Sequence, residues 1–385
     1  MIKTSSKRGH IALMVGHCAG MVDLVALPVW VGTLISRYGL DPQQAGMLAT
    51  LFLAGAVVAS LLLAPKFQRL NGRLVATLGF GVAAAAFFGV SMVSDFGSMA
   101  ALHGLAGFAA GSALSVTHGT IARSERPHRL FAIVGTALGV FGIIFMGSTP
   151  PLVAAAGGPM LFVVFAGVMA VGALAALLAF PVADPVPAGH DSAAAAKPLS
   201  AAVWFGVVGI GCMALVQAMT FSFLERVGSD RGFGLAAITG VLIALGVVSM
   251  IPAPLAAMLE KRLPARSVMM AGAAVQAMLV AVIMNSPAFA PYAMAASVFA
   301  AVMIFTHTFA FGLIASLDLS GRALAATPAM VMIGAAIGPI LGGTLVKASG
   351  YSSLSIAALV MACVAVFCFS RIPVAKAAPQ QGVAA

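Results

Sequence analysis

Charged side chains are scarce in this sequence: Asp, Glu, Lys and Arg make up 8% of the 385 residues, against about 25% in an average soluble domain. Hydrophobic residues make up 62%, and the mean hydropathy is +1.10. A folded globule of this composition lacks the polar groups needed to cover its surface, so a soluble enzyme is excluded. A disordered chain, which combines low hydrophobicity with high net charge, is excluded by the same numbers.

Cysteine is also scarce, and no nucleotide-binding motif is present. The four cysteines lie inside apolar runs and include no CxxC pair, which excludes a disulfide framework and a zinc knuckle. We expect them to be small buried hydrophobes. No Walker motif occurs, so an ion gradient rather than ATP is the expected energy source, and we expect no cofactor.

Long apolar runs fill most of the chain. A bilayer span takes about 20 apolar residues, which gives room for about twelve. The runs show none of the alternation of a barrel strand, so we predict helices, because only helices or closed barrels satisfy their backbone in lipid. The predicted spans are 10–36, 44–64, 74–94, 98–120, 131–155, 159–180, 201–225, 233–255, 267–286, 291–316, 327–348 and 352–371.

The basic residues predict the topology. With the N-terminus inside, only Arg37, Arg226, Arg231 and Lys347 of the 20 Lys and Arg lie on the outer side. Cytoplasmic loops carry such an excess of positive charge. We therefore expect both termini to be cytoplasmic in a bacterial-type inner membrane. The net charge of +10 reflects this topology and predicts contact with the bilayer, not with nucleic acid.

One polar segment divides the spans six and six. Residues 181–200 are rich in Pro and Ala and predict a cytoplasmic linker between an N-terminal bundle (1–180) and a C-terminal bundle (201–371). Residues 372–385 predict a disordered tail. The loop after span 2, RLNGR from Arg69, is similar to the loop after span 8, RLPAR from Arg262, which indicates pseudo-symmetric halves.

Polar groups at membrane depth recur in every third span. Such groups are costly in a bilayer and are functional candidates by default. We therefore predict an all-α integral membrane fold of twelve helices in two six-helix bundles, with spans 1, 4, 7 and 10 lining a central site of an alternating-access transporter. The candidates are His17, Asp23, His103, His118, Gln217, Glu225 and His307.

Three motifs resemble those of the major facilitator superfamily of secondary transporters. The segment from Gln68 to Arg73 keeps the basic residues and glycine of the family loop G-x-x-x-D-R-x-G-R but lacks its aspartate. His103, Gly107 and Gly111 follow the helix-4 pattern R-x-x-x-G-x-x-x-G, with histidine in the place of arginine. The run from Gly334 to Gly343 matches the G-x-x-x-G-P-x-x-G-G pattern that proton-linked exporters carry in helix 5, although here it lies in span 11.

The resemblance implies packing or conformational roles for eight residues of these motifs, and proton coupling for two others. Family proton antiporters commonly hold an acidic residue in helix 1 a few residues before a proline, as Asp23 and Pro28 do here. His103 occupies the place of the helix-4 arginine and is the expected partner of Asp23. Bonding between helices is the alternative for both side chains. The eight motif residues are Arg69, Gly72, Arg73, Gly107, Gly111, Gly334, Gly338 and Pro339.

Four polar side chains are expected to bind the substrate, with bonding between helices again the alternative: His17, Gln217, Thr306 and His307. No Lys or Arg lies in mid-span, so neutral or cationic organic solutes fit better than anionic ones. The leading hypothesis is proton-coupled transport of such a solute by a monomer, with export favoured. We expect Glu225 and Arg226 to form a solvated pair and His118 to be interfacial.

Copper transport is the second hypothesis. Spacings of 4, 3, 1 and 3 confine five soft donors of span 1 to an arc of about 100°, and such ligands suit Cu(I). Asp23 lies about 200° around the helix from Met21, so one narrow cavity cannot face both sets. A receptor or scaffold without transport is a third hypothesis. The soft donors are His10, Met14, His17, Cys18 and Met21, with Met303 and His307 in span 10.

Overall fold

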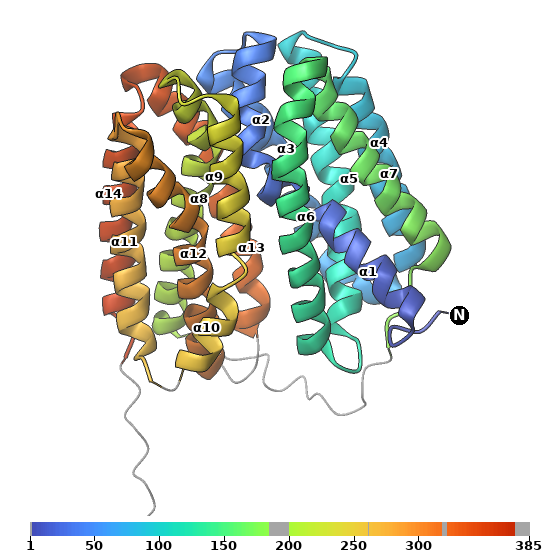
Figure 1. The fold of residues 1–385 in the computed structure, drawn as a ribbon. Coiled ribbons are helices and arrows are strands. Elements are labelled where there is room, and N and C mark those ends of the chain that lie inside the picture. Colours follow the sequence, from blue (N-terminus) through green and yellow to red (C-terminus); the bar gives the residue numbers. More distant parts are fainter. Residues whose placement is uncertain (1, 185–199, 261, 318–321, 374–385) are drawn as a thin grey trace, which may run out of the picture.

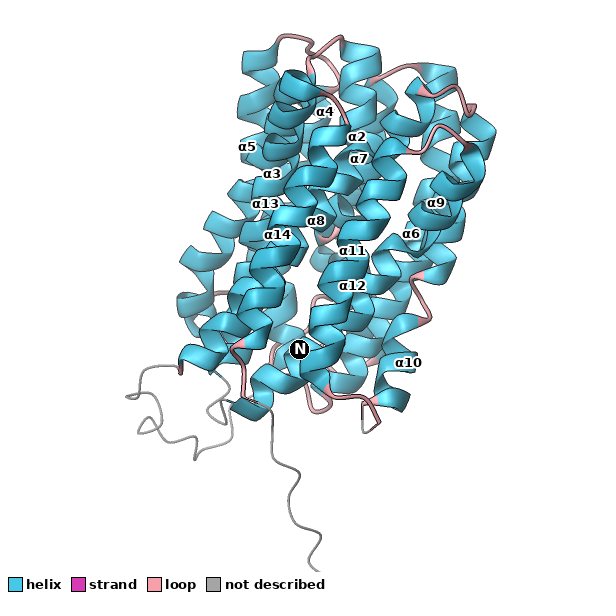
Figure 2. Cartoon of the chain, turned by 90° about the vertical axis from the view of Figure 1, so that its left-hand side faces the viewer, coloured by secondary structure: helices cyan, strands magenta, loops and turns pink. Residues whose placement is uncertain are grey.

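The computed structural model describes residues 2–184, 200–260, 262–317 and 322–373, and these ranges contain helices and no named strand (Figures 1 and 2). Two bundles lie side by side. The first consists of α1 (Lys7–Gly20), α2 (Val22–Tyr38), α3 (Pro42–Leu63), the 3-10 helix η1 (Ala64–Arg69), α4 (Gly72–Val90), α5 (Phe96–Ala122), α6 (Pro127–Ala156) and α7 (Pro159–Ala179).

The second bundle follows the linker region. It consists of α8 (Ala201–Asp230), α9 (Leu235–Val248), α10 (Pro252–Leu259), α11 (Ala265–Asn285), α12 (Phe289–Leu317), α13 (Arg322–Ser349) and α14 (Ser352–Ser370). The described residues include 12 segments that are long and apolar enough to cross a membrane. The predicted all-α membrane fold is therefore confirmed.

Two of the predicted spans are broken into two helices. The first span, Lys7–Tyr38, comprises α1 and α2, separated at Met21. The eighth, Leu235–Leu259, comprises α9 and α10, and the break precedes Pro252, whose ring cannot donate a backbone hydrogen bond. In α2, Pro28 likewise cannot donate to the Leu24 carbonyl one turn earlier. In the first turn of α2, the N–H groups at the helix N-terminus and the Leu24 carbonyl therefore lack the usual hydrogen-bond partner within the helix.

The boundaries of the predicted linker and tail also differ. At the start of the linker, the Val182 N–H donates to the Ile2 carbonyl at 3.0 Å, and the Thr4 hydroxyl donates to Asp184 at 2.6 Å. Ile372, assigned to the tail, is fully buried in the second bundle. Residues 185–199 and 374–385 of the predicted linker and tail lie outside the described residues.

Glycines allow the helices of each bundle to approach closely. A Cβ on Gly107 of α5 would overlap the Phe52 carbonyl of α3, and one on Gly111 would overlap Ala56. In the second bundle, Gly334 and Gly338 of α13 lie equally close to the backbone of α8. Small residues permit this packing in membranes, where lipid supplies no hydrophobic drive for association.

We predict that Gly107→Ala destabilises the protein by about 1–3 kcal/mol, because the new methyl group forces α5 away from α3. Gly104→Ala on the same helix is the matched control, since a Cβ there meets nothing within 4 Å. Thermal unfolding in detergent compares the two variants. Equal unfolding midpoints would show that α3 and α5 tolerate the wider spacing.

Candidate functional site

The two bundles meet at the end of the molecule away from the chain termini, which we call the distal end. There α2 packs on α8, α3 on α13 and α6 on α9. Gly46 of α3 lies against the Pro339 carbonyl of α13, and Gly343 of α13 lies against Pro42. The terminal-side half of the first span, α1, packs instead on α5, α6 and α7 of its own bundle (Figure 1). The closest approaches of the two backbones, at Gly46 and Gly343, thus lie toward the distal end, whereas the contact between the α6 and α9 segments extends to Gly139 and Met250.

Thr50 of α3 joins the two bundles by hydrogen bonds to the backbone of α13. Its hydroxyl donates to the Ala336 carbonyl at 2.7 Å and accepts from the Ile340 N–H at 3.1 Å. These two backbone groups are one turn apart, so the hydroxyl is inserted into the hydrogen-bond ladder of α13 beside Pro339. The turn at Pro339 therefore depends on a side chain of the other bundle.

Asp41 and Lys347 form an ion pair across the distal end, with an N···O distance of 2.9 Å. Burial acts to raise the pKa of Asp41, but hydrogen bonds from the Gln44 N–H and from Lys347 outweigh it and leave the pKa below its usual value. The contribution of this carboxylate to stability is therefore present above the unfolded pKa of about 3.9 and is lost as the pH falls through the lower folded pKa. Near neutral pH the pair stays ionised.

Asp23 lies at the break of the first span. It is half-buried, midway along Lys7–Tyr38, in the first turn of α2. Met21 supplies no side-chain cap for that turn, so Asp23 lies at a helix N-terminus without a side-chain cap. A helix N-terminus stabilises negative charge. Among the described residues, Asp23 forms no ion pair.

His103 is not the partner of Asp23. It is fully buried in the first bundle, where its ring stacks on Trp30 at 5.5 Å and contacts Phe162 edge-on. Its Nδ1 lies 2.7 Å from the Met99 carbonyl, which can only accept, so Nδ1 carries the proton. Its Nε2 has no partner in the described part of the chain. The expected pair of Asp23 and His103 is therefore absent from this state of the protein.

His17 contacts a residue that the sequence suggested was interfacial. Its Nδ1 lies 2.9 Å from Nε2 of His118 on α5, and the Phe131 ring covers His118 from α6. His17 lies six residues from Asp23 toward the terminal side, about 9 Å along a helix axis. One of the two facing nitrogens must lack a proton for this bond to form. The two rings therefore cannot both be imidazolium.

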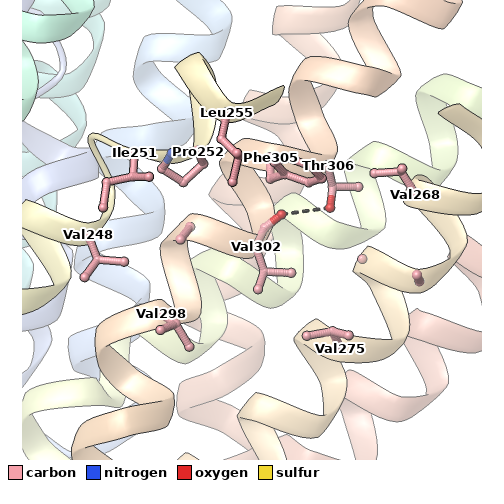
Figure 3. A pocket seen from close by; sticks show the side chains of 13 residues that line it. Val248, Ile251, Pro252, Leu255, Val268, Val275, Val298, Val302, Phe305 and Thr306 are labelled. Carbon is pink, nitrogen blue, oxygen red and sulfur yellow. Dashed lines mark hydrogen bonds between the residues drawn. The ribbon is translucent and has the colours of Figure 1, made fainter. Parts of the chain in front are cut away.

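Two expected substrate ligands in the second bundle are used by the protein itself. Gln217 accepts from Gln276 of α11 at 3.2 Å and is buried. The Thr306 hydroxyl donates to the Val302 carbonyl at 2.8 Å and lies beside an apolar cavity of about 430 Å³ between α9, α10, α11 and α12 (Figure 3). The Gln217 contact matches the alternative of bonding between helices, whereas the Thr306 bond lies within α12.

His307 remains a candidate ligand on α12. Its Nε2 is buried and has no partner among the described residues, and its ring lies 3.9 Å from that of Phe311. The remaining motif residues pack locally: Gly72 lies against Phe180, and Arg73 donates to the Leu177 carbonyl. Arg69 ends η1.

The soft donors of the copper hypothesis are not gathered. Met14 packs against the terminal-side core of the first bundle, whereas Met303 is buried in a core of the second. His10, Met14, His17 and Cys18 lie on α1, and Met21 lies at the helix break that follows it. No cluster of three or more His, Cys, Asp or Glu side chains that could hold a metal occurs in the ranges described.

Glu225 was expected to form a solvated pair with Arg226, and this expectation is wrong. Arg226 instead pairs with Asp230 at 2.7 Å, one turn along α8. Glu225 turns toward the first bundle, where a Cβ on Gly32 of α2 would overlap its Oε2. No pattern in the sequence predicts this contact, because a glycine in a neighbouring helix adds no polar residue to the pattern.

The sequence matches the family model of the Major Facilitator Superfamily over residues 12–320. The chain belongs to this family. A comparison with curated protein sequences finds no match. Membership in this family makes the protein a membrane transporter of some solute and not an enzyme.

Solved structures agree in fold. A bacterial homologue of the human lysosomal transporter Spinster, in an inward-facing and occupied conformation, aligns with a TM-score of 0.75 at 13% identity, covering 95% of this chain and 96% of that one. Its unoccupied inward-facing form aligns with a TM-score of 0.71. The nucleoside transporter NupG aligns with a TM-score of 0.69 at 15% identity, covering 95% and 97%. At these identities the likeness concerns the fold alone.

We predict that Thr50→Val shifts the protein away from the state that is closed at the distal end. Valine keeps the shape but removes both bonds to α13, and a loss of about 1 kcal/mol changes the closed-to-open ratio roughly fivefold. Distances between spin labels at the distal ends of the two bundles measure this ratio. Thr344→Val is the control, because its hydroxyl bonds only within α13. Equal ratios in both variants would contradict the prediction.

We further predict that His103→Phe leaves the pH profile of transport unchanged, since the phenyl ring replaces a neutral imidazole among aromatic rings. His103→Arg should lower the thermal unfolding midpoint strongly, because it buries an unpaired charge. A pH profile that shifts in the phenylalanine variant would restore His103 to a coupling role.

Proposed function

We propose that this protein couples proton movement to the transport of a small neutral or cationic organic solute, with Asp23 as the proton carrier. The supporting observation is the position of Asp23 at the break between α1 and α2. On one side of the break α2 packs against the second bundle, and on the other side the main contacts of α1 are with its own bundle. A carboxylate at this level lies where access from the two sides of the membrane alternates.

The surroundings of Asp23 suit reversible protonation. The N-terminus of α2 favours the ionised form, and withdrawal from water favours the neutral form. With no cation bound to it in the described part of the chain, small changes in hydration alter the balance between the two forms. His17 and His118 extend the series of titratable groups toward the terminal side.

The solute class follows from the charges at membrane depth. No Lys or Arg lies in mid-span to bind an anion, so neutral or cationic molecules fit best. The half-buried Asp23 and His307 supply the polar contacts. Among the similar structures is a nucleoside transporter, and a nucleoside belongs to the proposed class.

Export is the proposed direction. The excess of basic residues on the terminal side supports a cytoplasmic location of that side in a bacterial-type inner membrane. The protein is then closed toward the outside. Gly343, the last glycine of the α13 run that resembles the exporter motif, packs against Pro42 of α3 in the closed contact. An exporter loads its solute in this state. We propose that one chain forms the working unit.

The decisive experiment uses proteoliposomes that contain a pH-sensitive dye. A panel of nucleosides and organic cations is added under an imposed pH gradient, and solutes that alter proton flux in the wild type are identified. We predict that Asp23→Asn still binds such a solute, as judged by a thermal shift. Its coupled proton flux should be at least about tenfold lower than that of the wild type, because the amide cannot titrate.

Glu125→Gln is the control, since Glu125 lies in an exposed loop on the terminal side. Full wild-type coupling in Asp23→Asn would refute the proton-carrier role. Proton coupling would be refuted if the wild type transported solute without any proton movement. Uptake into right-side-out vesicles, compared with inverted vesicles, decides the direction.

A further inference from the structure

We infer that Glu225 is a second proton-binding residue of the transport cycle, and that it must be protonated for the distal end to close. This inference rests on the proposed proton coupling for its role in transport. The closure itself is an independent property of the interface between α2 and α8.

The first observation is the tight fit of Glu225 against α2. Glu225 is half-buried near the distal end of α8, and its Oε2 occupies the space that a side chain at position 32 would need. The neighbouring residues Val31, Thr33 and Leu34 of α2 are buried. The glycine thus leaves a pocket between the bundles that one carboxyl group fills.

The second observation is that no cation in the described part of the chain forms an ion pair with this carboxyl group. Arg226, the nearest cation in sequence, binds Asp230. Lys347 of α13 binds Asp41, and Arg231 donates to the Ile283 and Met284 carbonyls. Among the described residues, Glu225 itself has no ion-pair partner.

The other titratable groups near Glu225 are also engaged or distant. The Tyr292 hydroxyl of α12 donates to the Leu224 carbonyl at 2.7 Å, and that of Tyr351 donates to Asp230 at 2.6 Å. On α2, Asp23 and Arg37 lie nine and five residues from Gly32, about 13 and 7 Å along the helix axis. The Gly32 carbonyl already accepts from Ser36 at 2.8 Å.

These contacts determine which form of the carboxyl group the closed state accepts. An ionised carboxylate that is packed against a glycine loses part of its hydration, and its neighbour Arg226 is already paired with Asp230. Ionisation in this place therefore costs up to several kcal/mol. The neutral acid avoids this cost. Closure therefore takes one proton from the water on the distal side onto Glu225, and opening rehydrates the group and returns the proton to that side.

This cycle gives Glu225 and Asp23 separate tasks. Glu225 exchanges its proton with the distal compartment as α2 and α8 meet or part, whereas Asp23 lies at the break nearer the terminal side. A high proton concentration on the distal side then favours the state that opens toward the termini. An exporter needs that bias to return for its next solute.

Spin-label distances test the inference without any solute. Cysteines replace Met92 and Ala288, which lie in exposed connections at the distal ends of the two bundles, in a full-length chain from which the four native cysteines are removed. In the otherwise unchanged protein, we expect the closed-to-open ratio to fall roughly tenfold between about pH 5 and about pH 8.

Three variants decide the outcome. Glu225→Gln should stay closed with less than about a twofold change over the same range, because the amide is neutral throughout. Glu225→Asp should keep a pH dependence. Gly32→Ala should be less closed at every pH, since its methyl group displaces the carboxyl group. Glu125→Gln and Gly240→Ala are the controls, the latter because a Cβ at position 240 meets nothing within 4 Å.

Two results would overturn the inference: a wild-type pH dependence that persists in Glu225→Gln, or normal closure in Gly32→Ala. The Gly32→Ala result tests the inference even if Glu225→Gln fails to fold. Asp23→Asn, measured in the same way, should retain the pH-dependent closure. If coupled flux is absent from the wild type while closure still follows Glu225, the proposed function fails and this inference stands.

Discussion

The structure depends on one constraint: a polar group at membrane depth must find a partner in the protein or lie where water can reach it. Most backbone groups meet this requirement within their own helix. The exceptions lie at the breaks and prolines, and they are the places where the bundles meet or part. Beside Pro339, a threonine of the other bundle bonds to the Ala336 carbonyl and the Ile340 N–H. At the α1–α2 break Met21 supplies no side-chain cap, and Asp23 lies in the first turn of α2.

The twelve spans, the six-plus-six division and the closely packed glycine motifs follow from patterns within single segments. Hydropathy predicts each span. A glycine such as Gly107 lies where the backbone of a neighbouring helix leaves no room for a side chain. The break at Met21 was missed because no proline or polar run marks it, and Gly20 is one of 42 glycines.

The candidate site was harder to predict, because it is made of pairs from distant segments. Asp23 and His307 could be selected from the sequence, since an ionisable side chain at membrane depth costs free energy. The residues that the candidate side chains contact could not be predicted. The His103 ring packs in an aromatic core, and His118 contacts His17. Glu225 packs against Gly32, whereas its neighbour Arg226 pairs with Asp230. Which side of a helix faces the other bundle depends on rotations that hydropathy does not record.

The aromatic core of the first bundle has a practical consequence. The sequence contains only two tryptophans: Trp30 is fully buried on α2, and Trp204 on α8 is 50% exposed. Their emission spectra should therefore differ, and the Trp30 ring, stacked on an imidazole, reports on the helix that closes the distal end. The protein thus carries a native optical probe of that movement, which makes stopped-flow fluorescence of the unlabelled chain informative about the rate of its conformational cycle.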